Sequence, residues 1–413
     1  MALKTFSIYT LGCKVNQYDS SKVSRDLQAL GMNQVENGAD LAIINTCTVT
    51  HTALSKDKKM LEAARQANPL AKFAVVGCMP VNYREETEKL GVDYIFGAKD
   101  LDQFVAEIRL EKSINDVLDC ELHAIEYQND KSRYFLKIQD GCQQFCSYCI
   151  IPYNRGKLAS RGTAEIVDEV KKVTSGGIAE VVLCGIHLGL YGVDLVDQTN
   201  LVALLKMLFE IKDLKKIRLS SIEITEVSDD MIELMRNNRK LARHLHISLQ
   251  AGCDRILQAM NRPYTTSDFK TRIDKLREAV PEVAITTDVI VGFPGETDDA
   301  FRETVDYCQK IGFSKIHVFP FSAHEKTPAC NFPEQVNDEI KKQRASELQK
   351  ISNQLELAYN AKFQGEELEV IIDGRSKGGW YRGKSEYYFD VKFESEIKFA
   401  VGQSVKVKNW KLI

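Results

Sequence analysis

The chain has 413 residues, of which 44% are hydrophobic and 27% charged, values that exclude a disordered or collagen-like chain. Lys and Arg total 55 against 58 Asp and Glu, so the formal net charge is −3 and no overall positive field attracts nucleic acid. We find no secretory leader and no long apolar run, and we therefore expect a cytoplasmic protein of about three domains with no membrane segment. The 11 cysteines then indicate metal or redox chemistry rather than disulfides.

The amino-terminal part, residues 1–115, predicts a parallel sheet covered by helices. Its apolar runs TFSIYTL, LAIINT, FAVVG and DYIFGA alternate with helix-like periodic segments. Cys13, Cys47 and Cys78 each follow one of the first three predicted strands. Because parallel strands place their carboxyl ends at one edge, we expect the three cysteines to converge there and ligate a common centre. The alternative is that small cysteines simply suit buried strand ends.

The predicted middle domain covers residues 128–358. Residues 113–131 before it are polar and predict a linker or a short edge hairpin. Six strand candidates follow, YFLKIQD, EVVLCGI, KIRLSSI, LHISLQ, AITTDVIVG and KIHVFPFS, each separated from the next by a helical or loop segment. They predict a partial (β/α)6 barrel with its active face at the carboxyl ends of the strands. An amphipathic helix over residues 337–362 follows, and residues 361–413 predict a small five-stranded antiparallel barrel.

The densest chemical signal is Cys142, Cys146 and Cys149, on the loop after the first barrel strand. Three thiolates within eight residues suit zinc or an iron–sulfur cluster. A structural zinc site normally closes with four ligands, and this chain has no second CxxC motif. A non-enzymatic, zinc-stabilised RNA-binding protein is nevertheless an alternative.

The CxxxCxxC spacing resembles the radical S-adenosylmethionine (SAM) superfamily. The resemblance implies a 4Fe-4S cluster whose open iron binds the amino and carboxylate groups of SAM, and reductive cleavage of SAM to a 5'-deoxyadenosyl radical. The segments LCGIHLGLYG and VIVGFPGET agree with this, although Asp288 stands where the superfamily has a glycine. The SAM contacts that the resemblance implies are Tyr148, Gly185, His187, Glu223, Gln250, Gly292 and Pro294.

Together with the barrel signature, the amino-terminal stretches TLGCKVNQYDS, NTCTVT and VVGCMP resemble the methylthiotransferases. That family has an amino-terminal cluster domain, a radical-SAM barrel and a terminal TRAM barrel. The resemblance implies a second 4Fe-4S cluster on Cys13, Cys47 and Cys78, which carries the sulfur, and two SAM molecules per product. The methylthio group replaces an unactivated aromatic hydrogen, for which no side chain is a strong enough base, so we assign no catalytic side chain.

The runs GCKVNQYDS and GIHLGLYG resemble the branch that acts at C2 of N6-threonylcarbamoyladenosine at position 37 of tRNA. The branches that act on isopentenyladenosine at the same position, or on an aspartate of a ribosomal protein, are the alternatives. The stretch His324-Glu325-Lys326 and Cys253 depart from the family pattern. The remaining cysteines show no ligand spacing and are expected to be ordinary thiols: Cys120, Cys184, Cys253, Cys308 and Cys330.

The implied partners are a tRNA anticodon stem-loop and an electron donor of the flavodoxin or ferredoxin type, with the enzyme a monomer. Because the net charge is near zero, contacts with RNA phosphates must come from local clusters of Lys and Arg. The alternative is that these clusters are solvated faces of helices or strands. The candidate cations are Arg155, Lys157, Arg161, Arg236, Arg239, Lys240, Arg243, Lys406, Lys408 and Lys411. The aromatic residues of the last domain suit base stacking, although at least half must form its core: Trp380, Tyr387, Tyr388, Phe389 and Trp410.

Overall fold

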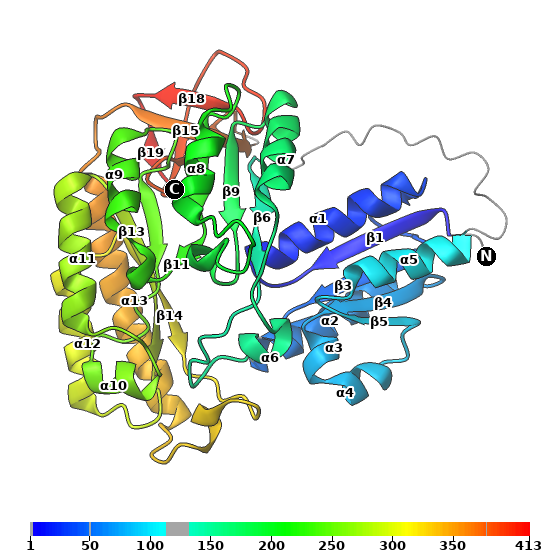
Figure 1. Cartoon of the computed structure of the whole chain (residues 1–413), viewed down its shortest axis with the longest axis horizontal. Coiled ribbons are helices and arrows are strands. Elements are labelled where there is room, and N and C mark those ends of the chain that lie inside the picture. The colour runs from blue at the N-terminus through cyan, green and yellow to red at the C-terminus, as the bar shows by residue number, and fades with distance from the viewer. Residues whose placement is uncertain (1–2, 49–50, 113–131, 377) are drawn as a thin grey trace. The chain divides into compact units, whose positions relative to one another are not determined.

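The structure is a computed structural model and describes residues 3–48, 51–112, 132–376 and 378–413. The predicted linker at 113–131, with Cys120, lies outside these residues. The chain divides into two compact units (Figure 1). Unit 1 comprises Met1–Glu126, Gly141–Gln144 and Cys149–Lys157, and unit 2 comprises Tyr127–Asp140, Phe145–Tyr148 and Leu158–Ile413.

Unit 1 contains the predicted parallel sheet, in the order β2-β1-β3-β4-β5. Its strands are β1 (Thr5–Thr10), β2 (Asn33–Gln34), β3 (Leu41–Thr46), β4 (Lys72–Gly77) and β5 (Tyr94–Gly97). Its helices are α1 (Lys14–Ala29), α2 (His51–Ala67), α3 (Met79–Asn82), α4 (Arg84–Glu88), α5 (Leu101–Lys112) and α6 (Ile151–Arg155). The edge strand β2 was not predicted, because its two exposed polar residues carry no hydrophobic pattern.

Alternation along the strands of unit 1 explains why helices cover both faces of the sheet. Leu41 and Ile43 are fully buried in a cluster with residues of α1 and α5. Ala42 and Ile44, which point the other way, are fully buried in a second cluster with residues of α2. The strand LAIINT is therefore apolar on both faces, as parallel strands in the middle of a sheet are.

Unit 2 contains the predicted partial barrel. Its strands follow one another in chain order, β6-β9-β10 in one sheet and β11-β12-β13-β14 in the next, and all pair in parallel. They are β6 (Tyr134–Lys137), β9 (Glu180–Cys184), β10 (Lys216–Leu219), β11 (Ser221–Ile222), β12 (His244–Ile247), β13 (Ala284–Val291) and β14 (Lys315–Pro320). The predicted strand KIRLSSI is thus divided at Ser220 into β10 and β11. The predicted strand YFLKIQD is likewise divided, at Ile138, into β6 and β7 (Gln139–Asp140), and β7 pairs antiparallel with β8 (Ala159–Ser160).

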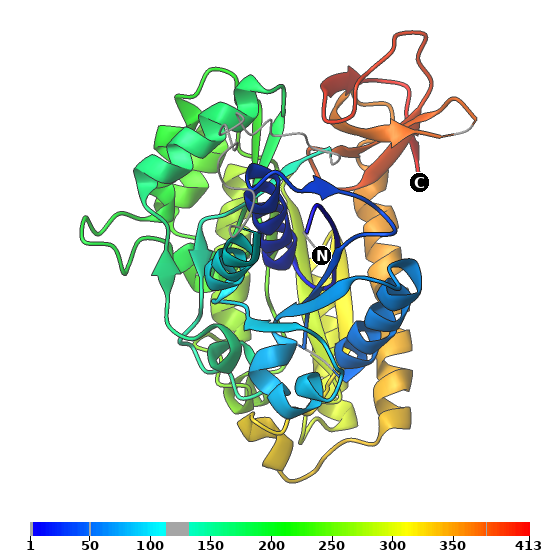
Figure 2. The ribbon, with the colours of Figure 1, turned by 90° about the vertical axis from the view of Figure 1, so that its right-hand side faces the viewer.

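The barrel helices alternate with these strands as predicted. They are α7 (Thr163–Ser175), α8 (Leu201–Phe209), α9 (Asp229–Asn237), α10 (Asp254–Ala259), α11 (Thr266–Ala279) and α12 (Asp298–Ile311). The predicted long helix is α13 (Asp338–Ala361), which runs along the barrel to the carboxy-terminal sheet (Figure 2). The hydroxyl of Ser352 on α13 accepts the Ile316 amide of β14 and donates to the carbonyl of the same residue, both at 2.9 Å.

The last five strands form an antiparallel sheet, ordered β18-β15-β16-β17-β19, in the region where the sequence predicts a small five-stranded antiparallel barrel. They are β15 (Leu368–Arg375), β16 (Tyr381–Ser385), β17 (Asp390–Phe393), β18 (Ser404–Val407) and β19 (Lys411–Leu412). Phe389 and Trp410, each 5% exposed, lie in its core. None of the helices in the described residues is both long and apolar enough to span a membrane.

Candidate active site

The first cysteine set lies at the carboxyl edge of the unit 1 sheet, as predicted. Cys13 precedes α1, Cys47 follows β3, and Cys78 lies between β4 and α3. Strands β1, β3 and β4 are direct neighbours in the sheet. Cys47 and Cys78 are buried and Cys13 is exposed. The amide of Cys78 donates to the Thr46 carbonyl at 3.2 Å, which links the second and third of these strand ends.

Gly12 and Asn16 explain how the first two strand ends approach each other. A Cβ atom at Gly12, whose φ is +105°, would lie 2.8 Å from the Cβ of Cys47 and 3.1 Å from its sulfur. The Asn16 side-chain amide donates to the carbonyls of Leu11 at 3.0 Å and Thr46 at 2.9 Å. The Cys13 thiol lies 3.6 Å from the Asn16 side-chain oxygen. The absence of a side chain at Gly12 and the hydrogen bonds of Asn16 therefore allow the loops that carry Cys13 and Cys47 to lie side by side.

The second cysteine set lies on the loop between β7 and α6. Cys146 is buried, whereas Cys142 and Cys149 are partly exposed. The Cys142 amide donates to the Gly156 carbonyl at 3.0 Å, and the Gln144 amide lies 3.5 Å from the Cys142 sulfur. No three His, Cys, Asp or Glu side chains in the described part of the chain converge on a single metal ion. The two cysteine sets are therefore candidate cluster ligands because of their chemistry and their positions on the fold.

The residues predicted to contact SAM all belong to the barrel unit, and most of them follow a strand. Gly185 and His187 come after β9, Glu223 after β11, Gln250 after β12, and Gly292 and Pro294 after β13. Because the strands are parallel, these positions share the carboxyl face of the barrel. Tyr148, on the cysteine loop, packs edge-on against Phe293 with ring centroids 6.5 Å apart.

Gln139 is a neighbour of this group that the sequence did not single out. Its side-chain oxygen accepts the His187 amide at 2.8 Å. The same oxygen would lie 3.0 Å from a Cβ atom at Gly185, so a larger residue there would displace it. Gln250 has φ +71°, and Gly292 has φ +71° with Lys341 side-chain carbons in the space of a Cβ. These backbone positions keep the carboxyl face closely packed.

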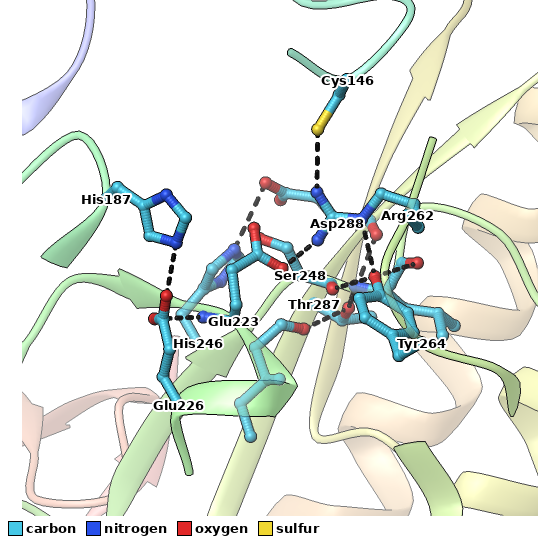
Figure 3. A network of polar contacts seen from close by, with 12 residues as sticks. Cys146, His187, Glu223, Glu226, His246, Ser248, Arg262, Tyr264, Thr287 and Asp288 are labelled. Carbon is cyan, nitrogen blue, oxygen red and sulfur yellow. Dashed lines mark hydrogen bonds and ion pairs between the residues drawn. The ribbon is translucent and has the colours of Figure 1, made fainter. Parts of the chain in front are cut away.

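Charged side chains at this face are arranged in pairs (Figure 3). His187 contacts Glu226 through its Nε2, and Arg262 contacts Glu223. Burial raises the pKa of Glu223 above its usual value, and the positive charge of Arg262 opposes that shift. None of Arg262, Glu226 and Tyr264 was singled out from the sequence, because a lone charge or tyrosine in or after a short helix carries no motif.

Another charged pair joins two neighbouring strands of the barrel, β12 and β13. The Nε2 of His246 on β12 is 3.3 Å from Oδ2 of Asp288 on β13, and its Nδ1 is 2.9 Å from the Thr286 hydroxyl. Burial lowers the pKa of the neighbouring His317, on β14. Asp288, at the position where the superfamily pattern has glycine, thus has a histidine partner inside the barrel.

The predicted phosphate-binding cations differ in how they are placed. Arg155 is 1% exposed and its guanidinium lies 3.3 Å from the Asp19 carboxylate, so both the predicted phosphate contact and its alternative, a solvated face, are wrong there. Arg243 is also buried, and Lys240 donates to two backbone carbonyls. Arg161 lies 2.7 Å from Glu169.

Exposed cations are found on the carboxy-terminal sheet. Lys406 and Lys408 are exposed, and Lys411 lies over the ring of Trp380, 5.0 Å from its centroid. Lys392 approaches the same ring at 5.7 Å. Trp410 and Phe389 are core residues, as expected for part of the aromatic set.

Among the other cysteines, Cys184, Cys253 and Cys308 are buried, and Cys330 is partly exposed. Burial raises the pKa of the Cys308 thiol to about 12. This agrees with their prediction as ordinary thiols.

Two family models match this chain. The model described as the radical SAM superfamily matches residues 136–308, and the one described as uncharacterized protein family UPF0004 matches residues 5–97. Among solved structures, the fold resembles the radical S-adenosylmethionine methyltransferase TsrM from Kitasatospora setae, with a TM-score of 0.58. That likeness has 14% identity and covers 80% of this chain and 77% of TsrM, so it supports the fold alone.

Curated relatives cover nearly the whole chain. "Threonylcarbamoyladenosine tRNA methylthiotransferase MtaB" of Bacillus subtilis is 34% identical over 98% of this chain and 94% of its own. The protein of the same name from Thermotoga maritima is 34% identical over 98% and 95%. "tRNA-2-methylthio-N(6)-dimethylallyladenosine synthase" of Caldicellulosiruptor saccharolyticus is 37% identical over 91% and 83%.

These relatives set aside the non-enzymatic zinc protein, because each is named as an enzyme and one alignment spans 98% of the chain. The residues that the radical-SAM model matches, 136–308, include the loop that carries Cys142, Cys146 and Cys149. The chain belongs to the radical-SAM tRNA methylthiotransferase family.

Proposed function

We propose that this enzyme adds a methylthio group to C2 of N6-threonylcarbamoyladenosine at position 37 of the tRNA anticodon loop. The observation that carries the proposal is the agreement of the Cys13 stretch, GCKVNQYDS, with end-to-end similarity to two MtaB proteins, which cover 98% of the chain. The dimethylallyladenosine synthase with 37% identity makes isopentenyladenosine the second candidate substrate.

The residues present fit two iron–sulfur clusters. We assign Cys142, Cys146 and Cys149 to the cluster that binds SAM, and Cys13, Cys47 and Cys78 to the auxiliary cluster. Each set offers three soft sulfur ligands, which leaves one iron of a four-iron cluster open. When bound, the clusters and SAM supply the radical and the sulfur that the reaction needs.

The chain's own residues then bind, orient and exclude water. We place SAM beside Gly185, Gly292 and Pro294, and Tyr148 packs against Phe293, the residue between Gly292 and Pro294. The pairs His187–Glu226 and Arg262–Glu223 fix charged groups at this face, and Gln250 is held by backbone hydrogen bonds of 2.9 Å to β13. Residues that are held in place in this way limit which bond of the substrate a radical can reach.

For tRNA we propose contacts from Lys406, Lys408 and the Lys411–Trp380 pair of the carboxy-terminal sheet, and from Arg161. A single-stranded anticodon loop can present an unstacked base to such a protein at modest cost. The three domain ranges, a cytoplasmic location, a flavodoxin- or ferredoxin-type donor and a monomeric state remain predictions.

Nucleoside mass spectrometry of tRNA from a strain lacking the gene tests the substrate. We expect methylthio-threonylcarbamoyladenosine to disappear and to return when the gene is supplied. If it persists while methylthio-isopentenyladenosine disappears, the second candidate is correct. If every methylthiolated tRNA nucleoside persists, the substrate is not tRNA.

A further inference from the structure

Arg262 lies against the buried cysteine of the second set, within unit 2. Three hydrogen bonds join the segments that carry them: the Ser147 amide to the Met260 carbonyl at 3.1 Å, the Ser147 hydroxyl to the Ala259 carbonyl at 2.8 Å, and the Asn261 amide group to the Phe145 carbonyl at 3.1 Å. These bonds bracket Cys146 on both sides. Phe145 and Asn261 both have positive φ, +50° and +58°, so each segment turns sharply at the contact.

The guanidinium of Arg262 uses all three of its nitrogens (Figure 3). Its Nη1 is 3.3 Å from the Cys146 sulfur, its Nε donates to the Tyr264 hydroxyl at 3.1 Å, and its Nη2 contacts Glu223. The Tyr264 hydroxyl in turn lies 2.8 Å and 2.9 Å from the carbonyls of Ser248 and Leu249. The Arg262 side chain is 2% exposed. Its position is therefore fixed from three directions.

A buried charge held in this way has a consequence for an iron–sulfur cluster. An arginine stays protonated in proteins and offers hydrogen bonds of fixed geometry. Hydrogen bonds to the ligating sulfurs, local charge and solvent exposure set the reduction potential of such a cluster. A cation beside a ligand sulfur favours the reduced state, which carries one more electron, and a nearby carboxylate opposes it.

We propose that Arg262 is a positioning residue that donates a hydrogen bond to the sulfur of Cys146 and raises the reduction potential of the SAM-binding cluster, with Glu223 as the opposing charge. The inference rests on the proposed assignment of Cys142, Cys146 and Cys149 to that cluster. It does not depend on which nucleoside is modified.

The test is a potentiometric titration of the anaerobically reconstituted full chain, with dithionite as reductant and the electron paramagnetic resonance of the reduced cluster as readout. All variants also carry Cys13→Ala, Cys47→Ala and Cys78→Ala, so that only the SAM-binding cluster contributes to the signal. The variants are Arg262→Gln, Arg262→Lys and Glu223→Gln. The matched control is Arg272→Gln, whose arginine pairs with Asp229 on exposed helix faces.

We expect Arg262→Gln to lower the ratio of reduced to oxidised cluster at least tenfold at a fixed potential, a shift of about 59 mV for one electron. Arg262→Lys, which keeps the charge, shifts less. Glu223→Gln shifts the potential in the opposite direction, whereas a general packing defect would move both variants the same way. Arg272→Gln leaves the potential unchanged.

The inference is overturned if Arg262→Gln binds normal iron and its potential matches the control, or if Glu223→Gln shifts it in the same direction. If Arg262→Gln assembles no cluster, the Glu223→Gln variant decides: a raised potential supports the inference and an unchanged or lowered one overturns it. A parent chain that binds no iron at Cys142, Cys146 and Cys149 overturns the cluster assignment and, with it, this inference. A wrong nucleoside assignment changes none of these readings.

Discussion

Arg155 and Asp19 form a buried ion pair inside unit 1, and it yields the first prediction. Their side chains are 1% and 3% exposed, and Arg155 also donates to Asn16 at 2.8 Å. Arg155→Met leaves the Asp19 carboxylate buried without this partner, which costs about 3–5 kcal/mol. Urea unfolding measures the loss.

The control for that prediction is an exposed pair in the same unit. Arg84 and Glu88 are 2.9 Å apart with side chains 57% and 54% exposed. Arg84→Met removes a pair of this kind, worth about 0–1 kcal/mol. Equal losses in the two variants would contradict a structural role for Arg155.

Glu180 on β9 gives a prediction for pH. It is fully buried and pairs with Arg218 through two contacts, of 2.9 Å and 3.1 Å. Burial raises its pKa, but the positive charges of Arg218, Arg133 and Lys216 together more than offset this, so the pKa lies below the ordinary 4.5. A lowered pKa in the folded state stabilises the protein above pH 4.5 and loses that effect as the pH falls through the folded pKa.

The comparison of wild type with Glu180→Gln tests this, because glutamine does not titrate. We expect the difference in free energy of unfolding to be constant from neutral pH down to about pH 5 and to shrink at lower pH. Denaturant titrations at stepped pH measure it. A difference that does not change with pH would show that the carboxylate charge contributes nothing.

Residues of the site were predictable where their spacing carried chemistry. The six cysteines were assigned because they recur at strand ends or within one short loop. Arg262, Glu226 and Gln139 were not, since each meets its partner only after strands from distant parts of the sequence pair. Arg155 was misjudged because a cation in a basic run is the same in sequence whether it faces solvent or a buried carboxylate.

At the scale of elements, the loop between β1 and α1 yields a prediction. Gly12→Ala forces a side chain into a left-handed backbone 2.8 Å from the Cβ of Cys47. We expect it to lower the iron bound by the first cysteine set and to lower the melting temperature. Gly38→Ala is the matched control, with φ +70° and no atom within 4 Å of the added Cβ. Equal iron contents in the two variants would show that close packing at Gly12 is unimportant for the first set.

The elements themselves were largely predictable, because buried parallel strands and amphipathic helices have distinct periods. The four main strands of the amino-terminal sheet, the six barrel units and α13 agree with their predicted ranges. The exceptions are short: β2 has two polar residues, β6 and β7 are separated only by Ile138, and β10 and β11 are separated only by Ser220. Such features depend on pairing partners and leave no local pattern.

At the scale of the whole molecule, the two cysteine sets are predicted to have separate tasks. Changing Cys142, Cys146 and Cys149 to Ala should abolish cleavage of SAM to 5'-deoxyadenosine. Changing Cys13, Cys47 and Cys78 should leave some cleavage but abolish sulfur transfer. Chromatography of the nucleoside products measures both. Sulfur transfer by the second variant, or continued SAM cleavage by the first, would contradict the roles assigned to the two cysteine sets.

The contact of the carboxy-terminal sheet with the barrel could not be predicted from the sequence. Arg218 of β10 donates to the carbonyls of Ser385 and Glu386, both at 3.2 Å. The His244 ring of β12 stacks on Tyr388 at 4.1 Å. Buried polar groups on barrel strands resemble site residues until the sheet that covers them is known.

The most direct test of the central claim uses the reconstituted enzyme with SAM and dithionite on two anticodon stem-loops. They differ only in carrying threonylcarbamoyladenosine or isopentenyladenosine at position 37. Mass spectrometry of the digested nucleosides measures methylthiolation. We predict the product from the threonylcarbamoyl stem-loop and little from the other; methylthiolation of the isopentenyl stem-loop alone, or of neither by an enzyme that cleaves SAM, would contradict the account.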